Sequence, residues 1–252
     1  MRFFIPFPLI IMKKIFIIGS IKIKRHLRYL KNLALKLAEY PFRNKKKAED
    51  QKNLQKLVKD KNIVKLHIGC GARTLAGWIN IDLHYEPYEN YLKYFGDEYY
   101  PKEIRGTRSD FYPMDVTKEK LPFLDNSVDI IFHEDFIEHI GQRDQISFLT
   151  ETLRILKKGG LHRINTPNLL SSMRDHSDFS KGFSGVYFEE WDKHRHKNLL
   201  TPDSLQELAS MVGYSKVIFN NRNKSISKLI PKEYRPTYDR PDEGNIFADL
   251  IK

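Results

Sequence analysis

Two glycines and a carboxylate stand at the ends of two apolar runs within residues 65–84, KLHIGCGARTLAGWINIDLH. The first run ends at Gly69 and Gly71, and the second ends at Asp82. A glycine turn lets a ligand approach the backbone closely, because no side chain stands in the way. A carboxylate that ends the next strand can accept hydrogen bonds from a ribose diol. Together these residues indicate a site for a nucleoside-containing cofactor.

Two classes of cofactor compete for this pattern. A dinucleotide site has a third glycine, in the spacing Gly-x-Gly-x-x-Gly, and a helix start that binds the pyrophosphate. Here Thr74 occupies the third position and no helix start is evident. S-adenosylmethionine (SAM) carries no phosphate, and the acidic end of a third apolar segment, Asp115, suits it better. SAM is therefore the favoured cofactor, and an NAD-dependent or nucleotide-sugar oxidoreductase is the less favoured alternative.

The elements that must position these residues alternate between strands and helices from Ile63 onward. Strands are expected at 64–68, 79–82, 112–116, 128–132, 161–165, 214–220 and 245–251, and helices at 134–140, 142–157 and 202–212. The short spacing after Gly69 reduces the first crossover to a turn. This alternation predicts a Rossmann-like α/β fold, a three-layer α/β/α sandwich with a mostly parallel sheet and an antiparallel final strand.

The positive charge of the chain lies in its N-terminal segment. The net charge is +11, but residues 1–63 hold 17 Lys and Arg against 4 Asp and Glu, whereas residues 64–252 hold 26 against 28. A near-neutral main domain argues against a nucleic-acid-binding core. We therefore expect two domains, a basic helical extension over residues 1–62 and a main domain over residues 63–252.

The extension carries an amphipathic pattern over residues 21–38, with an apolar stripe opposite a row of Lys and Arg. Such a helix suits either an anionic membrane surface or a cap on the main domain. The apolar run in residues 3–12 is too short to span a bilayer, and Met12 is an alternative start. The one cysteine, Cys70, excludes an internal disulfide. These features predict a cytoplasmic protein, peripheral to the membrane if the helix binds it.

Six segments of the main domain together resemble the class I SAM-dependent methyltransferases of the type-11 group. They are LHIGCG (66–71), GWINID (77–82), LPFLDNSVDIIF (121–132), FIEHI (136–140), LRILKKGGLHRINTPN (153–168) and HKNLLTPDSLQELASMVGY (196–214). The resemblance implies a bound SAM molecule, held by nine residues: Gly69, Cys70, Gly71, Asp82, Leu83, Asp115, Val116, His133 and Glu134. Among these, Asp82 would hold the ribose, Asp115 would face the adenine, and His133 and Glu134 would line the boundary with the substrate.

The resemblance further implies transfer of a methyl group to a small-molecule or sugar- or lipid-linked acceptor, as in cell-surface polysaccharide biosynthesis. Asp135 and His139 are the candidate catalytic residues, although relatives often carry histidine at position 135 and His139 is equally suited to a structural role. His194, Arg195 and His196 lie in a loop that could contact the substrate, and no metal site is expected. The alternative function is a membrane-surface interaction protein with vestigial catalysis.

Overall fold

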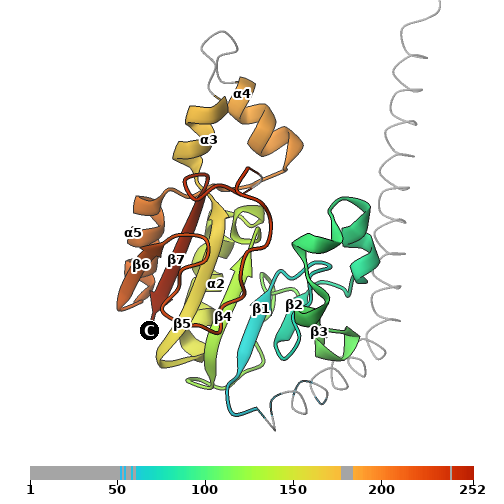
Figure 1. The fold of residues 1–252 in the computed structure, drawn as a ribbon. Helices are drawn as coiled ribbons and strands as arrows, with labels where there is room; N and C mark the ends of the chain where they lie inside the picture. Colours follow the sequence, from blue (N-terminus) through green and yellow to red (C-terminus); the bar gives the residue numbers. More distant parts are fainter. Residues whose placement is uncertain (1–51, 53, 55–57, 59–60, 177–183, 239) are drawn as a thin grey trace, which may run out of the picture. The chain divides into compact units, whose positions relative to one another are not determined.

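The computed structural model describes residues 52, 54, 58, 61–176, 184–238 and 240–252. Its centre is one sheet of seven strands in the order β3-β2-β1-β4-β5-β7-β6 (Figure 1). The strands are β1 Lys65–Ile68, β2 Ile79–Asp82, β3 Phe111–Pro113, β4 Val128–Glu134, β5 Leu156–Pro167, β6 Lys216–Asn220 and β7 Asn245–Ile251. The order reverses between β1 and β4, which is the switch point where open α/β sheets bind ligands.

The sheet is parallel from β3 through β5, and β7 runs antiparallel to both β5 and β6. This arrangement confirms the Rossmann-like fold with a mostly parallel sheet and an antiparallel final strand. Only a turn joins β1 to β2, as the short spacing in the sequence predicted.

Two helices, α2 Gln142–Ile155 and α5 Pro202–Val212, cover one face of the sheet. Phe148 of α2 and Leu205 of α5 are buried in the main core together with strand residues such as Leu66. Thr201 caps the start of helix α5, and its side chain accepts a hydrogen bond from the backbone N–H of Ser204. This cap satisfies a backbone donor at the helix start and fixes where the chain turns into the helix.

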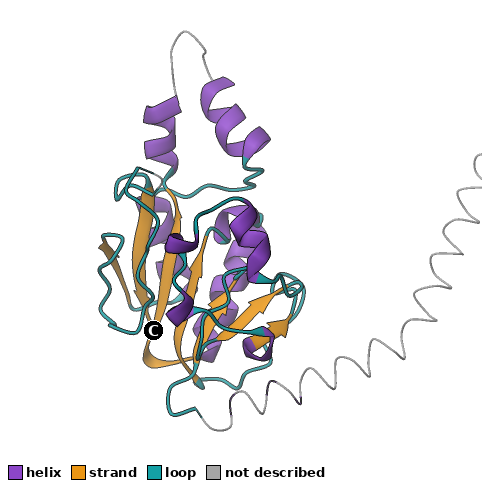
Figure 2. Cartoon of the chain, turned by 45° about the vertical axis from the view of Figure 1, so that its right-hand side comes forward, coloured by secondary structure: helices purple, strands orange, loops and turns teal. Residues whose placement is uncertain are grey.

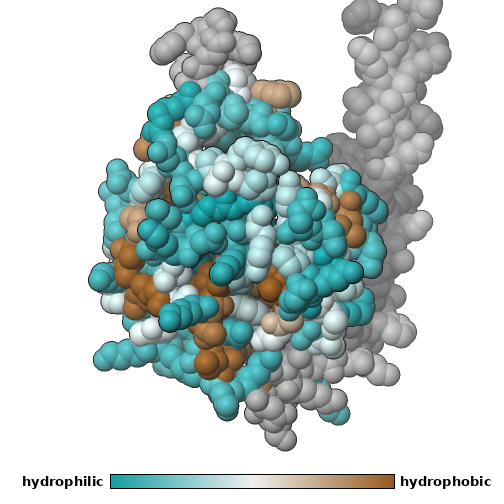
Figure 3. Space-filling view, in the orientation of Figure 1, coloured by the Kyte–Doolittle hydropathy of each residue, from teal (hydrophilic) through white to brown (hydrophobic). Residues whose placement is uncertain are grey.

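The other face differs from the expected three-layer sandwich. Among the described residues it is covered by short 3₁₀ turns and by the segment 221–244, not by α-helices (Figures 1 and 2). The turns are η1 Tyr88–Lys93, η2 Asp97–Tyr99, η3 Lys102–Ile104 and η4 Arg108–Asp110. Tyr91, Tyr100 and Ile230 pack there against Ile130 and Phe132. The view in Figure 3 is mainly hydrophilic, with apolar side chains in small separate patches.

Two predicted helix boundaries are wrong. The segment 134–140 is not an α-helix, because β4 continues to Glu134, Asp135 takes a left-handed φ of 49°, and only a 3₁₀ turn follows at Ile137–His139 (η5). Helix α2 ends at Ile155, and residues 157–160 belong to β5 instead of closing the helix. There Lys157 pairs with Asp129 on β4, at 2.7 Å from Nζ to Oδ1, which holds it at the sheet.

Helices α3 Leu169–His176 and α4 Ser184–Tyr187 lie beyond the ends of the central strands (Figures 1 and 2), and α4 continues into a π-helical turn at Phe188–Lys193 (η6). This segment follows β5 and therefore lies at the same edge of the sheet as the carboxyl ends of the parallel strands. No helix among the described residues is both long and apolar enough to cross a membrane.

The compact unit that contains the sheet spans Asn53–Lys252. Leu54 is 2% exposed and joins the main core, and Val58 packs against it. Part of the segment before the boundary expected at residues 62 and 63 therefore contributes to the core. The predicted helix over residues 21–38, with its membrane-binding or capping role, lies outside the described residues.

Candidate cofactor-binding site

A cavity of about 490 Å³ opens at the carboxyl ends of β1, β2 and β4. Six of the nine predicted cofactor residues line it: Gly69, Gly71, Asp82, Leu83, Asp115 and Val116. Both candidate catalytic residues, Asp135 and His139, line it as well. Residues more than 70 positions apart in the sequence thus meet around one space, because parallel strands end at one edge of the sheet.

The glycine turn after β1 has a conformation that other residues adopt at a cost. Gly69 and Gly71 have φ values of 65° and 51°, in the left-handed region. A Cβ atom on Gly69 would lie 2.5 Å from Cδ2 of Phe136, so this position has no room for a side chain. A Cβ atom on Gly71 would meet no protein atom within 4 Å. The space next to Gly71 is therefore open for a ligand that approaches the backbone.

Asp82 connects the end of β2 to this turn. Its Oδ2 accepts a hydrogen bond from the backbone N–H of Gly71 at 2.8 Å, and its Oδ1 accepts one from Leu83 at 2.7 Å. A carboxylate has about four acceptor positions, so two remain for a ligand in the cavity. Asp82 can therefore hold the turn in place and bind a diol at the same time.

Asp115 is fixed by its own neighbours. Its Oδ1 accepts hydrogen bonds from the backbone N–H of Thr117 at 3.1 Å and from the hydroxyl of Thr117 at 2.6 Å, and its Oδ2 pairs with Lys118. Partial burial by itself would raise the pKa of Asp115, but the hydrogen bonds from Lys118 and Thr117 outweigh burial and lower it. The carboxylate is therefore ionised at neutral pH and can accept a hydrogen bond from an amino group.

Three predicted cofactor residues do not line the cavity. Cys70 is 1% exposed, and burial raises the pKa of its thiol, which makes it an inert core residue. His133 is fully buried, and its ring meets Phe136, Phe148 and His162 edge-on. Side chains alternate between the two faces of a strand, and that of His133 points into the core. Its placement therefore gives no support to a role at the cofactor–substrate boundary.

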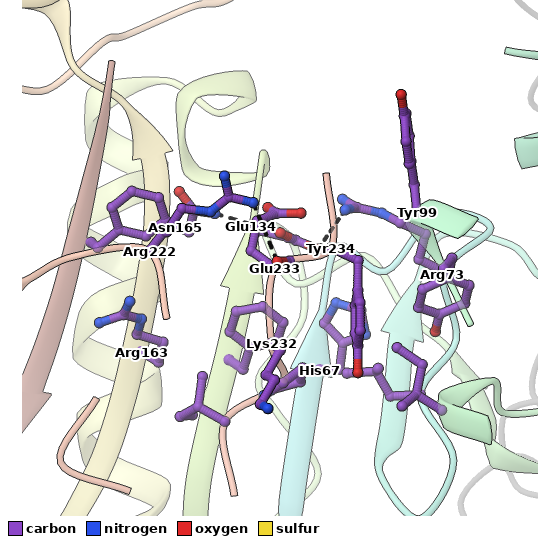
Figure 4. Close-up of a pocket in the computed structure, with 17 residues that line it drawn as sticks. His67, Arg73, Tyr99, Glu134, Arg163, Asn165, Arg222, Lys232, Glu233 and Tyr234 are labelled. Atoms are coloured by element: carbon purple, nitrogen blue, oxygen red, sulfur yellow. Dashed lines mark hydrogen bonds and ion pairs between the residues drawn. The ribbon is translucent and has the colours of Figure 1, made fainter. Parts of the chain in front are cut away.

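Glu134 points to the opposite side of the sheet from the helices, toward Arg73. Its Oε1 lies 2.5 Å from Nη1 of Arg73. Figure 4 shows this pair beside Glu233 and Tyr234, at a small second cavity of about 30 Å³. Glu134 therefore lies in an ion pair outside the lining of the 490 Å³ cavity, and its contact with the cofactor stays a prediction.

Asp135 belongs to the same charged cluster. The cluster has three arginines and three acids: Arg73, Arg235, Arg240, Glu134, Asp135 and Glu233. Oδ2 of Asp135 pairs with Arg240, lies 3.1 Å from Nη2 of Arg235 and 3.6 Å from Nη2 of Arg73. These contacts occupy one oxygen of the Asp135 carboxylate with arginine partners. The cluster also fixes the segment 221–244 over the sheet.

A second polar group surrounds His139. The ring of His139 lies 4.9 Å from that of His196, and ligand atoms of Glu138, His139 and His196 all lie within 4.8 Å of one another. Nδ1 of His196 lies 2.7 Å from Oε2 of Glu190 in the π-helical turn. Glu138 is 1% exposed; burial, with Asp135 as a second cause, raises its pKa. His194 stacks on His196 from outside, and Arg195 is exposed.

The sequence reasoning missed several residues of this region. Phe136, Ile140 and Lys197 line the cavity, and Arg235 and Arg240 reach Asp135 from about 100 positions away. The FIEHI segment was a signal for Phe136 and Glu138, since an aromatic residue, an acid and a histidine follow within five residues of the end of β4. The arginines had no signal in the sequence, because they belong to an irregular segment.

Residues 66–164 match the model of the methyltransferase domain family, in its type-11 group. This part of the chain is similar to a methyltransferase domain. The match confirms the resemblance that the six motifs indicated. A probable S-adenosylmethionine-dependent methyltransferase from Mycolicibacterium smegmatis is 38% identical over 52 residues, which are 21% of this chain and 20% of that protein. The chain thus spans about a fifth of the length of this curated relative. The name of this relative specifies S-adenosylmethionine, the cofactor that the sequence predicted.

Solved structures of SAM-dependent methyltransferases are also similar to this chain. One from Archaeoglobus fulgidus aligns with 86% of this chain and 98% of its own, at 14% identity and a TM-score of 0.46. A possible histamine N-methyltransferase from Thermotoga maritima aligns with 85% of this chain and 98% of its own, at 16% identity and a TM-score of 0.45.

Proposed function

We propose that this chain is a SAM-dependent methyltransferase that acts on a small-molecule or a sugar- or lipid-linked acceptor. The observation that carries the proposal is the 490 Å³ cavity, in which Gly71, Asp82 and Asp115 converge from the ends of three neighbouring strands. The volume lies within the range of about 300–1,000 Å³ that is usual for small-molecule sites. The acceptor class comes from the resemblance alone and is the less specific part of the proposal.

The residues around the cavity fit the cofactor. The open space beside Gly71 admits a ligand against the backbone, and Asp82 has acceptor positions for the two ribose hydroxyls. The ionised Asp115 accepts from the adenine amino group, with Val116 as an apolar wall. When bound, SAM supplies a methyl group activated by a positively charged sulfur. The protein's own task is then to align an acceptor with that group and to exclude water.

Of the two candidate catalytic residues, His139 is the one available to an acceptor. Asp135 has Arg235 and Arg240 as partners, so its carboxylate is already engaged in ion pairs. His139 is exposed at the cavity, and its pKa is lowered because its ring is partly withdrawn from water and faces His196. A neutral imidazole can accept the proton of an acceptor hydroxyl, or it can form a hydrogen bond with the acceptor.

Calorimetric titration of the purified protein with S-adenosylhomocysteine and with SAM tests this function. We expect one site per chain for each compound, and no heat of binding with NAD. Binding of NAD without binding of either SAM compound would instead support the oxidoreductase alternative. Incubation of labelled SAM with extracts of small molecules and lipid-linked sugars would then identify the acceptor.

A further inference from the structure

We propose that Glu138, His139 and His196 form a binding site for a divalent transition-metal ion, at the edge of the cofactor cavity. Two imidazoles and one carboxylate are a ligand set that Zn²⁺, Mn²⁺ and Fe²⁺ accept in proteins. All ligand atoms lie within 4.8 Å of one another. Ligands of a tetrahedral ion are about 3.4 Å apart, given bonds of about 2.1 Å, so the most distant pair must approach by up to about 1.4 Å.

Glu138 provides an observation independent of the clustering. Its Oε1 is buried and has no hydrogen-bond partner, whereas Oε2 accepts a hydrogen bond from the hydroxyl of Thr166 at 3.0 Å. A buried carboxylate oxygen without a partner destabilises the fold, because it has lost its hydrogen bonds to water and forms none in the protein. A cation bound at Oε1 would remove that cost, and the bond from Thr166 already fixes the orientation of the carboxylate.

His196 is oriented in the way that metal-binding histidines usually are. Its Nδ1 lies 2.7 Å from Oε2 of Glu190, so Nδ1 carries the proton and Nε2 keeps its lone pair. Glu190 is itself held by the hydroxyl of Ser172. An acid that fixes the tautomer of a ligating histidine raises its basicity toward the ion. Glu190 and Ser172 are thus positioning residues of the proposed site.

His139 completes the site and gives it access to the cavity. It is exposed and lines the cofactor cavity, whereas Glu138 and His196 are buried behind it. Because His139 is the exposed member of the three, its side chain is the one that can move to close the ligand set. Three protein ligands leave at least one position open to water or to an acceptor, as in catalytic zinc sites.

The ion would give the proposed methyltransferase a way to activate an acceptor hydroxyl; this step depends on the proposed function, whereas metal binding does not. A hydroxyl oxygen bound to the ion has a lowered pKa, so its O–H bond breaks and the proton passes to water. His139 then acts as a ligand and not as a general base. The sequence predicted no metal here, because no His/Asp pair near His196 shows the helical i,i+4 spacing of a ligand motif.

The test uses the full chain after treatment with EDTA and its removal. Calorimetric titration with ZnCl₂ should give one site per chain, and MgCl₂ should bind much more weakly. The variants Glu138→Gln and His139→Ala should each lose affinity for Zn²⁺ by on the order of a hundredfold, because each lacks a direct ligand. His194→Ala is the matched control: it stacks on His196 but is not a ligand, and it should bind Zn²⁺ as the wild type does.

Electron paramagnetic resonance of bound Mn²⁺ adds a spectroscopic signature, since nitrogen couplings from imidazole should appear in the wild type and decrease in His139→Ala. If Glu138→Gln does not fold, as far-UV circular dichroism would show, the exposed His139→Ala variant decides the outcome. Absence of a Zn²⁺ site, or Zn²⁺ binding unchanged in both ligand variants, would overturn the proposal. Titration with S-adenosylhomocysteine in EDTA separates the two proposals: binding there supports the cofactor site whatever the metal result, and its absence weakens only the proposed function.

Discussion

The carboxylate of Asp82, at the end of β2, accepts a hydrogen bond from the backbone N–H of Gly71, in the turn after β1, at 2.8 Å. This bond joins the two features that first indicated a cofactor site. It also means that Asp82 shapes the turn as well as facing the cavity, so a change at either residue affects the other. The first two predictions use this relationship.

Asp82→Ala should lower the affinity for SAM. If Asp82 binds the ribose as proposed, the change removes a carboxylate acceptor from it, and it also releases the amide of Gly71. Since a hydrogen bond to a charged group contributes about 1.5–3 kcal/mol, affinity should fall on the order of tenfold to a hundredfold. Asp82→Asn keeps one acceptor oxygen and should show a smaller loss. Calorimetric titration measures both, and an unchanged dissociation constant in Asp82→Ala would remove Asp82 from the site.

Gly71→Ala should weaken SAM binding on the order of tenfold, because its methyl group enters space that the cofactor approaches. Gly77 is a matched control: its φ is 74°, no protein atom lies within 4 Å of a Cβ placed there, and it does not line the cavity. Both substitutions should destabilise the fold by about 1 kcal/mol through the left-handed backbone. Thermal unfolding checks that equality, and equal SAM affinity in the two variants would contradict the placement of the cofactor at Gly71.

Asp135→Asn distinguishes an anchoring carboxylate from a catalytic base. The change leaves Arg235 and Arg240, both largely buried, without one of their anionic partners. We expect the free energy of unfolding to fall by about 1–3 kcal/mol. Asp125→Asn breaks an exposed pair with Arg154 and should cost no more than about 1 kcal/mol. Urea unfolding measures both; a loss of turnover at wild-type stability would make Asp135 a catalytic residue instead.

Three buried histidines should make the fold sensitive to mild acid. Burial lowers the pKa of His67 to about 4 and of His133 to about 3, and it lowers that of His162 well below its usual value. In the unfolded chain these groups titrate near about 6.5. Between these values the unfolded state binds protons that the folded state does not, so stability falls as the pH falls from about 6.5 toward 4.

His133→Leu should reduce the slope of the unfolding free energy against pH by the contribution of one proton, about 1.4 kcal/mol per pH unit. Neither ring nitrogen of His133 has a hydrogen-bond partner, so the change breaks no polar contact. His84→Leu is the control, because the exposed ring of His84 meets water in both states. Urea unfolding at several pH values gives the slopes. Identical slopes for His133→Leu and the wild type would show that His133 is protonated in the fold.

The sequence alone determined the order of the strands along the chain, the glycine turn and the acids that end β2 and follow β3. These follow from local rules: short apolar runs predict strands, and side chains at the carboxyl ends of parallel strands meet at one edge. That is why Gly71, Asp82 and Asp115 were expected together and are found around one cavity. The proposed function followed from the same motifs.

Only the tertiary structure decided what lies beyond each strand end. β4 extends two residues further than expected, so His133 and Glu134 point to opposite faces of the sheet, one into the core and one to Arg73. A change of one residue in a strand reverses the face of a side chain, and no local pattern fixes it. The partners of Asp135 and Glu138, Arg235 and His196, come from irregular segments far along the chain, where chain folding and not periodicity sets the contacts.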